Sequence, residues 1–360
     1  MNTRSQTRKK KNRDKLSELP DCVLLHILSF LRTTTAVQSC ILSTRWKHLW
    51  KHLTTLTFCS SYFKHLKSFT GFVSQVLSLR DASTPLHVLD FKRKGILEPH
   101  VLNRILKYAL SHNVQQLQIN IESYVEHFPP CFGSCQTLTS LNLSVGHTNG
   151  RWGTLYPNYL NFPALTNLSL HHFTFCGSDE DGSFEPFSKF KRLNSLIIDH
   201  CKLLDAQKLC ISSPTLVNLT IKSSYYTRHE IELSNTPSLS TFDFEGTPVH
   251  KLSRSNTNLS SIKHVNIHVD MWLILNDTPL VLLNWLVELS NIESLTVSLT
   301  TLQVLSNVPD LLKLEFSSLY NLKSFKVKAH KHNPPILSDE IVNFLLQNAP
   351  SAERTISYIN

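Results

Sequence analysis

The stretch Leu53-Thr54-Thr55-Leu56-Thr57-Phe58 introduces the pattern that dominates this 360-residue chain. Large apolar residues stand at its first, fourth and sixth positions, and ten later segments repeat that order. The eleven copies begin at Leu53, Leu86, Val114, Leu138, Leu165, Leu193, Leu216, Leu239, Ile262, Ile292 and Leu322. From the second copy onward, successive copies start 23 to 30 residues apart. A single hexamer of this kind can occur in any strand, whereas eleven at similar spacing indicate one structural unit stacked along an axis.

The alternation inside each copy predicts a strand, because successive side chains of a strand point to opposite faces. Helical patterns lie between some copies: an apolar stripe over 69–77 that ends near Asp81, a segment opened by Pro99, and the stretch 280–289. The 23-residue repeats have little room for a helix and are expected to return by loops. We therefore predict an α/β fold, a curved solenoid with parallel strands on its concave face and an uneven convex face. Such an array has a large continuous surface, which favours binding over catalysis.

Composition and charge exclude several other classes of protein. Hydrophobic residues make up 41% of the chain, enough for a packed core, and no stretch of about 18 uninterrupted apolar residues suggests a membrane span. The net charge of +9 is concentrated in the first 15 residues, which hold seven basic residues and one acidic residue. The run 8–13 indicates a nuclear import signal or a solvated tail without a receptor. The remaining charge shows no basic stripe, so specific nucleic-acid binding is not expected.

The eight cysteines are scattered along a chain whose N-terminus does not resemble a secretory signal, which predicts reduced thiols inside the cell. His127, Cys131 and Cys135 have a spacing that could suit zinc, but a fourth ligand and a second cysteine pair are missing. We therefore expect no metal. Cys201 lies three residues after Ile198, where a stacked repeat can place a side chain that bonds the backbone at the turn.

Residues 14–53 differ from the repeats and predict three short helices. The first begins after Pro20, the second covers about 37–41, and Ser43 can cap the third. Apolar residues follow helical spacing in the first and third helices, at Leu24, Ile27, Leu28 and Leu31 and at Trp46, Leu49, Trp50 and Leu53. A core of about 40 residues is small, so the tryptophans and leucines could anchor a partner. The alternative is that they only fill this core or dock on the first repeat.

Two segments of this unit, 19–31 and 36–50, together closely resemble the F-box, with the best match to plant proteins that join an F-box to leucine-rich repeats. Their patterns are LPDxxLxxILSFL and LSxRWxxLW. Arg32 stands where the family usually has proline, and Thr35 where it often has an acidic residue. Near the C-terminus, 344–350 is similar to the start of the FBD segment that follows the repeats in many relatives.

The resemblance implies an F-box that binds a Skp-type adaptor and, through it, a cullin scaffold. The positions that the resemblance assigns to the adaptor are Leu19, Pro20, Ile27, Leu28, Leu31, Val37, Leu42, Ser43, Trp46 and Trp50. We expect a disordered basic tail over 1–13, the F-box over 14–58, the leucine-rich-repeat solenoid over 59–330, and a C-terminal helix with a partial FBD-like segment over 331–360.

The polar residues on the predicted concave face are the candidates for capturing a protein. Acidic residues lie at the middle of the array and lysines near its end, a mixture that suits a protein better than a polyanion. The candidates are His171, Asp199, Lys222, Asp243, Glu245, His268, Lys326 and Lys328. The competing interpretation places recognition on the irregular segments 145–161 and 176–188, since loops on rigid scaffolds often bind.

No motif of a catalytic or cofactor site occurs: there is no glycine-rich phosphate loop, GxSxG, HExxH or CxxC pair. We therefore predict a non-enzymatic protein without a cofactor, located in the nucleus, the cytoplasm or both. Its expected function is substrate recognition for an SCF-type E3 ubiquitin ligase. The alternative is an F-box and leucine-rich-repeat scaffold, or a small-molecule co-receptor, that works outside degradation.

Overall fold

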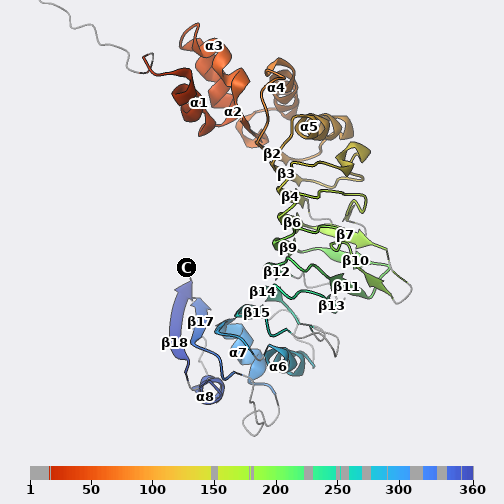
Figure 1. Ribbon diagram of the computed structural model, residues 1–360, viewed down its shortest axis with the longest axis vertical. Helices are drawn as coiled ribbons and strands as arrows, with labels where there is room; N and C mark the ends of the chain where they lie inside the picture. Colours follow the sequence, from red (N-terminus) through yellow and green to blue (C-terminus); the bar gives the residue numbers. More distant parts are fainter. Residues whose placement is uncertain are drawn as a thin grey trace, which may run out of the picture.

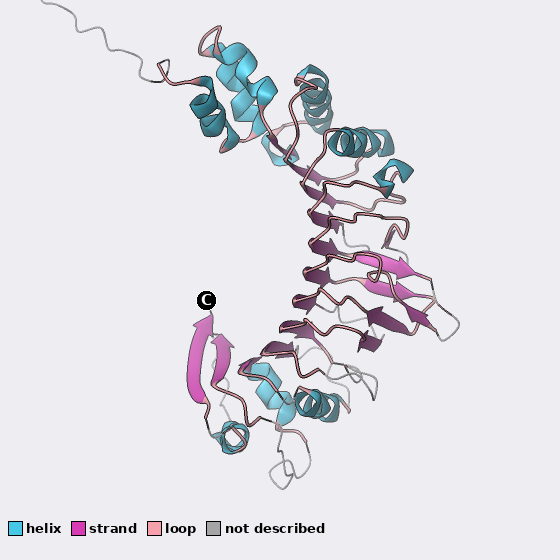
Figure 2. Cartoon of the chain, viewed as in Figure 1, coloured by secondary structure: helices cyan, strands magenta, loops and turns pink. Residues whose placement is uncertain are grey.

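The computed structural model describes residues 16, 18–146, 153–177, 179, 182–222, 230–248, 252, 259–269, 277–289, 291–308, 319–330, 339–349 and 351–359. Figure 1 shows an arc that begins with a cluster of short helices and continues as a stack of strands. The strands line the inner side of the arc, and helices or shorter strands cover its outer side (Figure 2). The predicted α/β solenoid with a strand-lined concave face is confirmed.

The N-terminal cluster consists of three short helices with two turns of 3-10 helix between and after them. Pro20 precedes the first helix, as expected for a residue with a fixed φ and no backbone N–H. The elements are α1 (Asp21–Ser29), α2 (Thr33–Gln38), η1 (Ser39–Ile41), α3 (Trp46–Leu49) and η2 (Trp50–His52). Their small core is formed by Leu24, Leu28, Ala36, Trp46, Leu49, Trp50 and Leu53.

Two buried polar side chains, Thr33 and Arg80, attach this cluster to the solenoid. The hydroxyl of Thr33 accepts a hydrogen bond of 2.7 Å from the backbone N–H of Thr57. The Arg80 guanidinium donates to the carbonyl oxygen of Leu53 at 2.8 and 2.9 Å. Because a sheet edge presents unpaired backbone groups, the Thr33 contact also covers part of the edge at which the sheet begins.

One parallel sheet of 12 strands forms the concave side, and its register keeps the hexamers aligned. Leu219, for example, pairs with Leu196 on one side and with Phe242 on the other. In order across the sheet, the strands are β1 (Thr55–Cys59), β2 (Val88–Lys94), β3 (Gln116–Glu122), β4 (Ser140–Val145), β6 (Asn167–His171), β9 (Ser195–Asp199), β12 (Asn218–Lys222), β14 (Thr241–Gly246), β15 (His264–Val269), β16 (Ser294–Ser298), β17 (Ser324–His330) and β18 (Glu353–Ile359). The fourth and sixth residues of every copy are buried, as the period of two predicted.

The last strand was not expected from the sequence. All eleven predicted copies form strands, and β18 is a twelfth that pairs with β17. Arg354 occupies the register position beside Phe325, where every earlier copy has an apolar residue, so the repeat pattern is broken there. The expected boundary at 330 therefore ends a strand but not the sheet, and the expected boundary at 58 falls within β1.

The convex side changes along the arc with the length of the repeats. The longer repeats carry α4 (Leu66–Leu79), α5 (Pro99–Ser111) and α6 (Thr278–Glu288), which confirms the three predicted helices. Two further helices are α7 (Leu299–Leu305), which was not predicted, and the expected C-terminal helix α8 (Asp339–Gln347). Two short 3-10 turns, η3 (Ser60–Tyr62) and η4 (Pro130–Gly133), complete the helical elements of the described residues.

In the middle repeats, the segments that connect successive strands of the main sheet are not loops alone. They form two small parallel sheets on the convex side. One sheet has β5 (Thr154–Leu155), β7 (Phe173–Cys176) and β10 (Lys202–Leu204), and the other has β8 (Ser183–Phe184), β11 (Lys208–Ile211) and β13 (Glu230–Leu233). They lie outside the main sheet (Figure 2), and the buried side chains of Phe173 and Phe175 fill the layer between. These strands run through parts of the segments 145–161 and 176–188, which were expected to be irregular.

The buried thiol of Cys201 has the role expected from its place after the strand. Its sulfur lies 3.5 Å from the carbonyl oxygen of Leu170 and 3.6 Å from that of Asp199. Burial raises the pKa of this thiol to about 12, so it stays protonated and can donate to these carbonyls. Within the described ranges, no helix is both long and apolar enough to cross a membrane.

Candidate interaction surfaces

Exposed apolar side chains gather in the N-terminal helical cluster. Large apolar side chains are normally buried, and groups of them at a surface indicate a place where a partner binds. Among the described residues of 16–42, six are exposed: Leu16, Val23, Phe30, Leu31, Ile41 and Leu42. Ile41 and Phe30 are the most open, with 84% and 76% of their surface exposed. We name these six residues the apolar face of the cluster.

The residues that the resemblance assigned to the adaptor divide into two groups. Leu31, Leu42, Ser43 and Pro20 are exposed, while Leu19, Ile27 and Val37 are half-buried. Leu28, Trp46 and Trp50, in contrast, are buried in the core of the cluster. These three side chains fill the small core, because three short helices have few other residues with which to build one. Their contact with an adaptor stays a prediction.

Sequence reasoning missed four members of the apolar face, Leu16, Val23, Phe30 and Ile41. They fall outside the helical stripe on which the reasoning relied, so their apolar character was the only available signal. It also missed Arg45, whose Nε donates a 2.7 Å hydrogen bond to Asp21 Oδ1 and whose terminal nitrogen donates to the carbonyl of Leu19. Arg45 thereby holds the start of α1 against the start of α3.

The second surface lies on the concave side, along the outward-facing residues of β6 to β17. We name it the concave strip, and it consists of Ser169, His171, Ile197, Asp199, Thr220, Lys222, Asp243, Glu245, Asn266, His268, Thr296, Ser298, Lys326 and Lys328. All eight predicted capture residues belong to it. Most members are half-buried, because each is flanked by the side chains of neighbouring strands about 4.8 Å away.

Near the middle of the arc, one carboxylate is shared by two histidines. His171 Nδ1 lies 2.9 Å from Asp199 Oδ2, and His200 Nδ1 bonds the other carboxylate oxygen. Partial burial alone would raise the pKa of Asp199, but the hydrogen bonds and charges of both histidines outweigh it and hold that pKa well below its usual range. The hydrogen bond with Asp199 raises the pKa of His200, against its partial burial. The cluster is thus largely satisfied within the strip.

Ser169 joins this cluster, because its hydroxyl lies 2.8 Å from His171 Nε2. A serine, a histidine and an aspartate therefore follow one another in a chain of hydrogen bonds. Hydrolytic sites with that order also need donors for an oxyanion. Here β6 is paired on both sides, by β4 and β9, so its backbone N–H groups are used in the sheet. The arrangement is a hydrogen-bond chain along the strip, and the backbone N–H groups of β6 are not available to an oxyanion.

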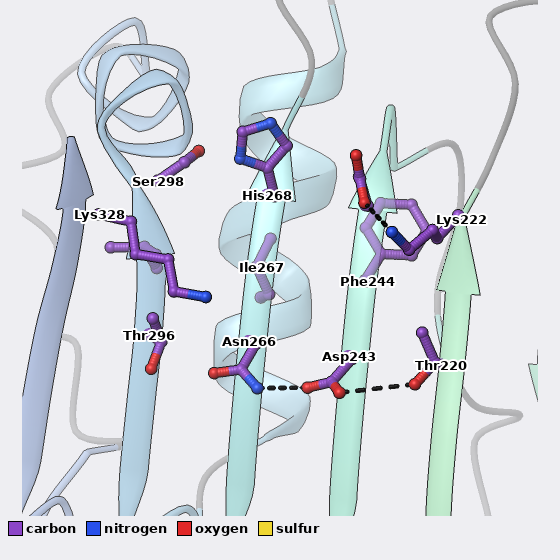
Figure 3. A pocket seen from close by; sticks show the side chains of 12 residues that line it. Thr220, Lys222, Asp243, Phe244, Asn266, Ile267, His268, Thr296, Ser298 and Lys328 are labelled. Atoms are coloured by element: carbon purple, nitrogen blue, oxygen red, sulfur yellow. Dashed lines mark hydrogen bonds and ion pairs between the residues drawn. The ribbon is translucent and has the colours of Figure 1, made fainter. Parts of the chain in front are cut away.

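Farther along, side chains of β12 and β14 also pair across strands. Lys222 Nζ lies 2.9 Å from Glu245 Oε2, and the hydrogen bond to Glu245 raises the pKa of Lys222. Asp243 accepts hydrogen bonds from the amide of Asn266 and, at 3.5 Å, from the hydroxyl of Thr220. Figure 3 shows these pairs on one side of a shallow hollow of about 210 Å³.

The other side of the hollow is different in charge. Lys328 and His268 line it together with Thr296 and Ser298. For Lys328, Lys326 and His268, no ion pair is formed with any residue that the structure describes. The strip therefore has a self-paired centre and a basic end.

The possible zinc residues do not assemble into a site. The thiol of Cys131 faces Asn103 Oδ1 at 3.0 Å, whereas the buried thiol of Cys135 faces Thr137 Oγ1 at 3.3 Å. His127 lies near Glu126. No group of three potential metal ligands occurs in the part of the chain that the structure describes.

Comparisons with known proteins identify both parts of the chain. The F-box domain family matches 16–58, and the leucine-rich repeats of the family described as "FBD-associated F-box protein At5g56370, LRR repeats" match 102–325, more than half of the chain. The F-box/LRR-repeat protein At4g14103 of Arabidopsis thaliana is 27% identical over 96% of this chain and 91% of its own length. The putative F-box/LRR-repeat protein At5g02930 of the same plant is 26% identical over 96% of this chain and 72% of its own length. With its F-box and its stack of repeats, this chain belongs to the F-box/leucine-rich-repeat protein family.

Proposed function

We propose that this chain is the substrate-recognition subunit of an SCF-type E3 ubiquitin ligase. The observation that carries the proposal is the apolar face of the F-box, which leaves Phe30, Ile41 and Leu42 exposed in a chain that buries most of its apolar residues. Such a face suits a Skp-type adaptor, which would link the chain to a cullin scaffold. The proposed domain division remains a tail at 1–13, the F-box at 14–58, the solenoid at 59–330 and an FBD-like segment at 331–360.

The proposed mechanism is proximity rather than chemistry performed by this chain. A protein bound on the concave strip would be held near the ubiquitin-charged enzyme, which raises the effective concentration of the reacting groups. That requires a fixed relation between the F-box and the solenoid. The contacts of Thr33 with Thr57 and of Arg80 with Leu53 support such a relation, because both join buried groups across the junction.

The proposed place for the captured protein is the concave strip, through its eight predicted residues. An alternative site on 145–161 and 176–188 is less favoured, because the described parts of these segments are partly used in the convex sheets. A small-molecule co-receptor site on the concave strip is also less favoured. Ligand pockets usually have volumes of about 300–1,000 Å³, larger than the open hollow on the strip. We propose a nuclear or cytoplasmic location; the basic tail that could direct it lies outside the described residues.

Adaptor binding can be tested with two exposed members of the apolar face. Leu31→Asp combined with Leu42→Asp should abolish co-purification of a Skp-type adaptor, because each buried interface anchor can contribute about 2 kcal/mol or more. Neither side chain is part of the core of the cluster, so the fold should persist. The matched control is Leu79→Asp combined with Ile96→Asp, two exposed apolar residues outside the F-box.

Loss of the adaptor with the F-box pair and its retention with the control would support the proposal. Unchanged recovery of the adaptor with Leu31→Asp and Leu42→Asp would refute it. A second measurement addresses degradation. A protein captured by the repeats should have a longer half-life in cells that express the Leu31→Asp and Leu42→Asp variant than in cells that express the wild type. If that protein is captured but its half-life does not change, a non-degradative scaffold becomes the better description.

A further inference from the structure

The concave strip neutralises its own charges at the centre but not at its C-terminal end. Asp199 is bonded by His171 and His200, and Glu245 is paired with Lys222. Acidic and basic residues alternate there from strand to strand, so the centre offers little net attraction to a charged group. Its acidic residues would repel an anion. Any ligand chosen by its charge would therefore find more free charge elsewhere on the strip.

That free charge lies on β17. Lys326 and Lys328 are both exposed. The adjoining strands hold one acidic residue, Glu353 of β18, which lies two residues before Thr355 and forms no ion pair with either lysine. On one side they are in register with Thr296 and Ser298 of β16, and on the other with Thr355 and Ser357 of β18. Two lysines are thus placed between residues that carry hydroxyl groups, with no carboxylate in either adjoining register position.

A separate observation points to a ligand at the same place. Thr296 is only 8% exposed, and its hydroxyl has no hydrogen-bond partner among the described residues. This hydroxyl is accessible from the hollow, so a polar group bound there can form a hydrogen bond with it. Thr296 borders the hollow, and Figure 3 shows Lys328 extending across β16 toward it, with His268 on the next strand.

The hydrogen-bond donors of these lysine, threonine and histidine side chains favour an oxyanion as the ligand. An ammonium donates up to three hydrogen bonds, a hydroxyl and an imidazole can each donate one, and hydrogen bonds to an ionised acceptor are the stronger kind. We propose that Lys326, Lys328, Thr296 and His268 bind an oxyanion carried by the captured protein, either a phosphate ester or a side-chain carboxylate. This inference rests on the proposed function of the strip in substrate recognition.

The proposal can be tested with the full-length chain and three degenerate peptide libraries that differ only at a fixed centre: serine, phosphoserine or glutamate. The wild type should bind at least one anionic library about tenfold or more tightly than the serine library, since one charge-assisted bond can supply that factor. Preference for phosphoserine alone would identify a phosphate ester, and preference for both would identify any side-chain oxyanion. The preference should weaken as salt is raised.

Lys326→Gln combined with Lys328→Gln should remove the preference. The matched control is Lys92→Gln combined with Lys94→Gln, which removes two lysines of the same spacing from β2 at the other end of the sheet. Urea midpoints should be unchanged for both pairs, because all four side chains are at least partly exposed.

A wild type that binds all three libraries equally would overturn the proposal, as would a preference that survives in the Lys326 and Lys328 variant. Adaptor co-purification distinguishes this result from failure of the proposed function, since it depends on the F-box. A chain that binds the adaptor but has no anion preference would refute the oxyanion site alone.

Discussion

The F-box and the solenoid are both rich in large apolar residues, but the two regions place these residues differently. In each solenoid hexamer the fourth and sixth residues are buried, so position in the strand decides whether a side chain is inside. In the F-box, apolar residues close in sequence differ in burial: Leu28 is fully buried, while Phe30 and Leu31 are exposed. A stacked array buries each strand against two neighbours. A unit of about 40 residues cannot bury every apolar residue that it contains.

The difference shows where a sequence pattern is a reliable guide to function. In the solenoid the apolar pattern describes the core, and the polar residues between describe the accessible surface. In the F-box the apolar pattern describes core and partner surface together. Only the packing of α1, α2 and α3 separates Trp46, which supports the fold, from Leu42, which is available to a partner.

The largest effect is expected inside the F-box, where core and surface residues are closest in sequence. Trp46→Ala should lower the free energy of unfolding by about 3–5 kcal/mol, because it removes a large buried side chain from a small core. Ile41→Asp, at a side chain that is 84% exposed, should change it by no more than about 0.5 kcal/mol. Urea unfolding of the full chain, followed by circular dichroism, measures both. Similar losses for the two variants would contradict the division into core and apolar face.

A somewhat smaller effect is expected for one strand of the solenoid. Leu219→Ala removes a fully buried side chain of β12 and should cost about 2–5 kcal/mol. Lys222→Ala, on the opposite face of the same strand, should cost no more than about 1 kcal/mol, since its pair with Glu245 is partly exposed to solvent. The comparison uses the same urea titration. Equal costs would mean that the strand is out of register by one residue, which would exchange its faces.

The smallest effect is a pH dependence at the histidine cluster on the concave strip. The pKa of His200 is raised in the folded chain, so its stabilising contribution is complete below its ordinary pKa of about 6.5 and is lost as pH rises through the folded value. The pKa of Asp199 is lowered, so its contribution is complete above its ordinary value of about 3.9 and is lost in stronger acid. The cluster should be most stabilising between about pH 4 and 6.5.

Asp199→Asn should therefore reduce the free energy of unfolding most near pH 5.5, by less than about 1 kcal/mol because the cluster is partly exposed. The difference from the wild type should shrink by pH 9. Urea titrations at the two pH values measure it. The control is Lys92→Gln, which removes a partly exposed ion pair with Asp90 on β2 that contains no histidine. A difference for Asp199→Asn that does not change with pH would refute the role of His200.

The repeating part of the fold could be predicted in detail because its rules are local. A strand alternates its faces, so the hexamer pattern located eleven strands and identified the residues of the concave strip. The twelfth strand could not be located in the same way. In β18 an arginine occupies the position of the apolar residue, and the strand is defined by its pairing with β17.

The sequence by itself determined that this chain is a stack of strands with a three-helix unit before it, because hydrophobic periodicity depends only on residues that are close together in the sequence. Only the tertiary structure decided which F-box residues face outward and which polar groups of the strip pair. His171 and Asp199 are 28 residues apart, and Lys222 and Glu245 are in adjacent repeats. Such pairs depend on the register between strands and on side-chain conformations, and these are fixed only when the repeats are stacked.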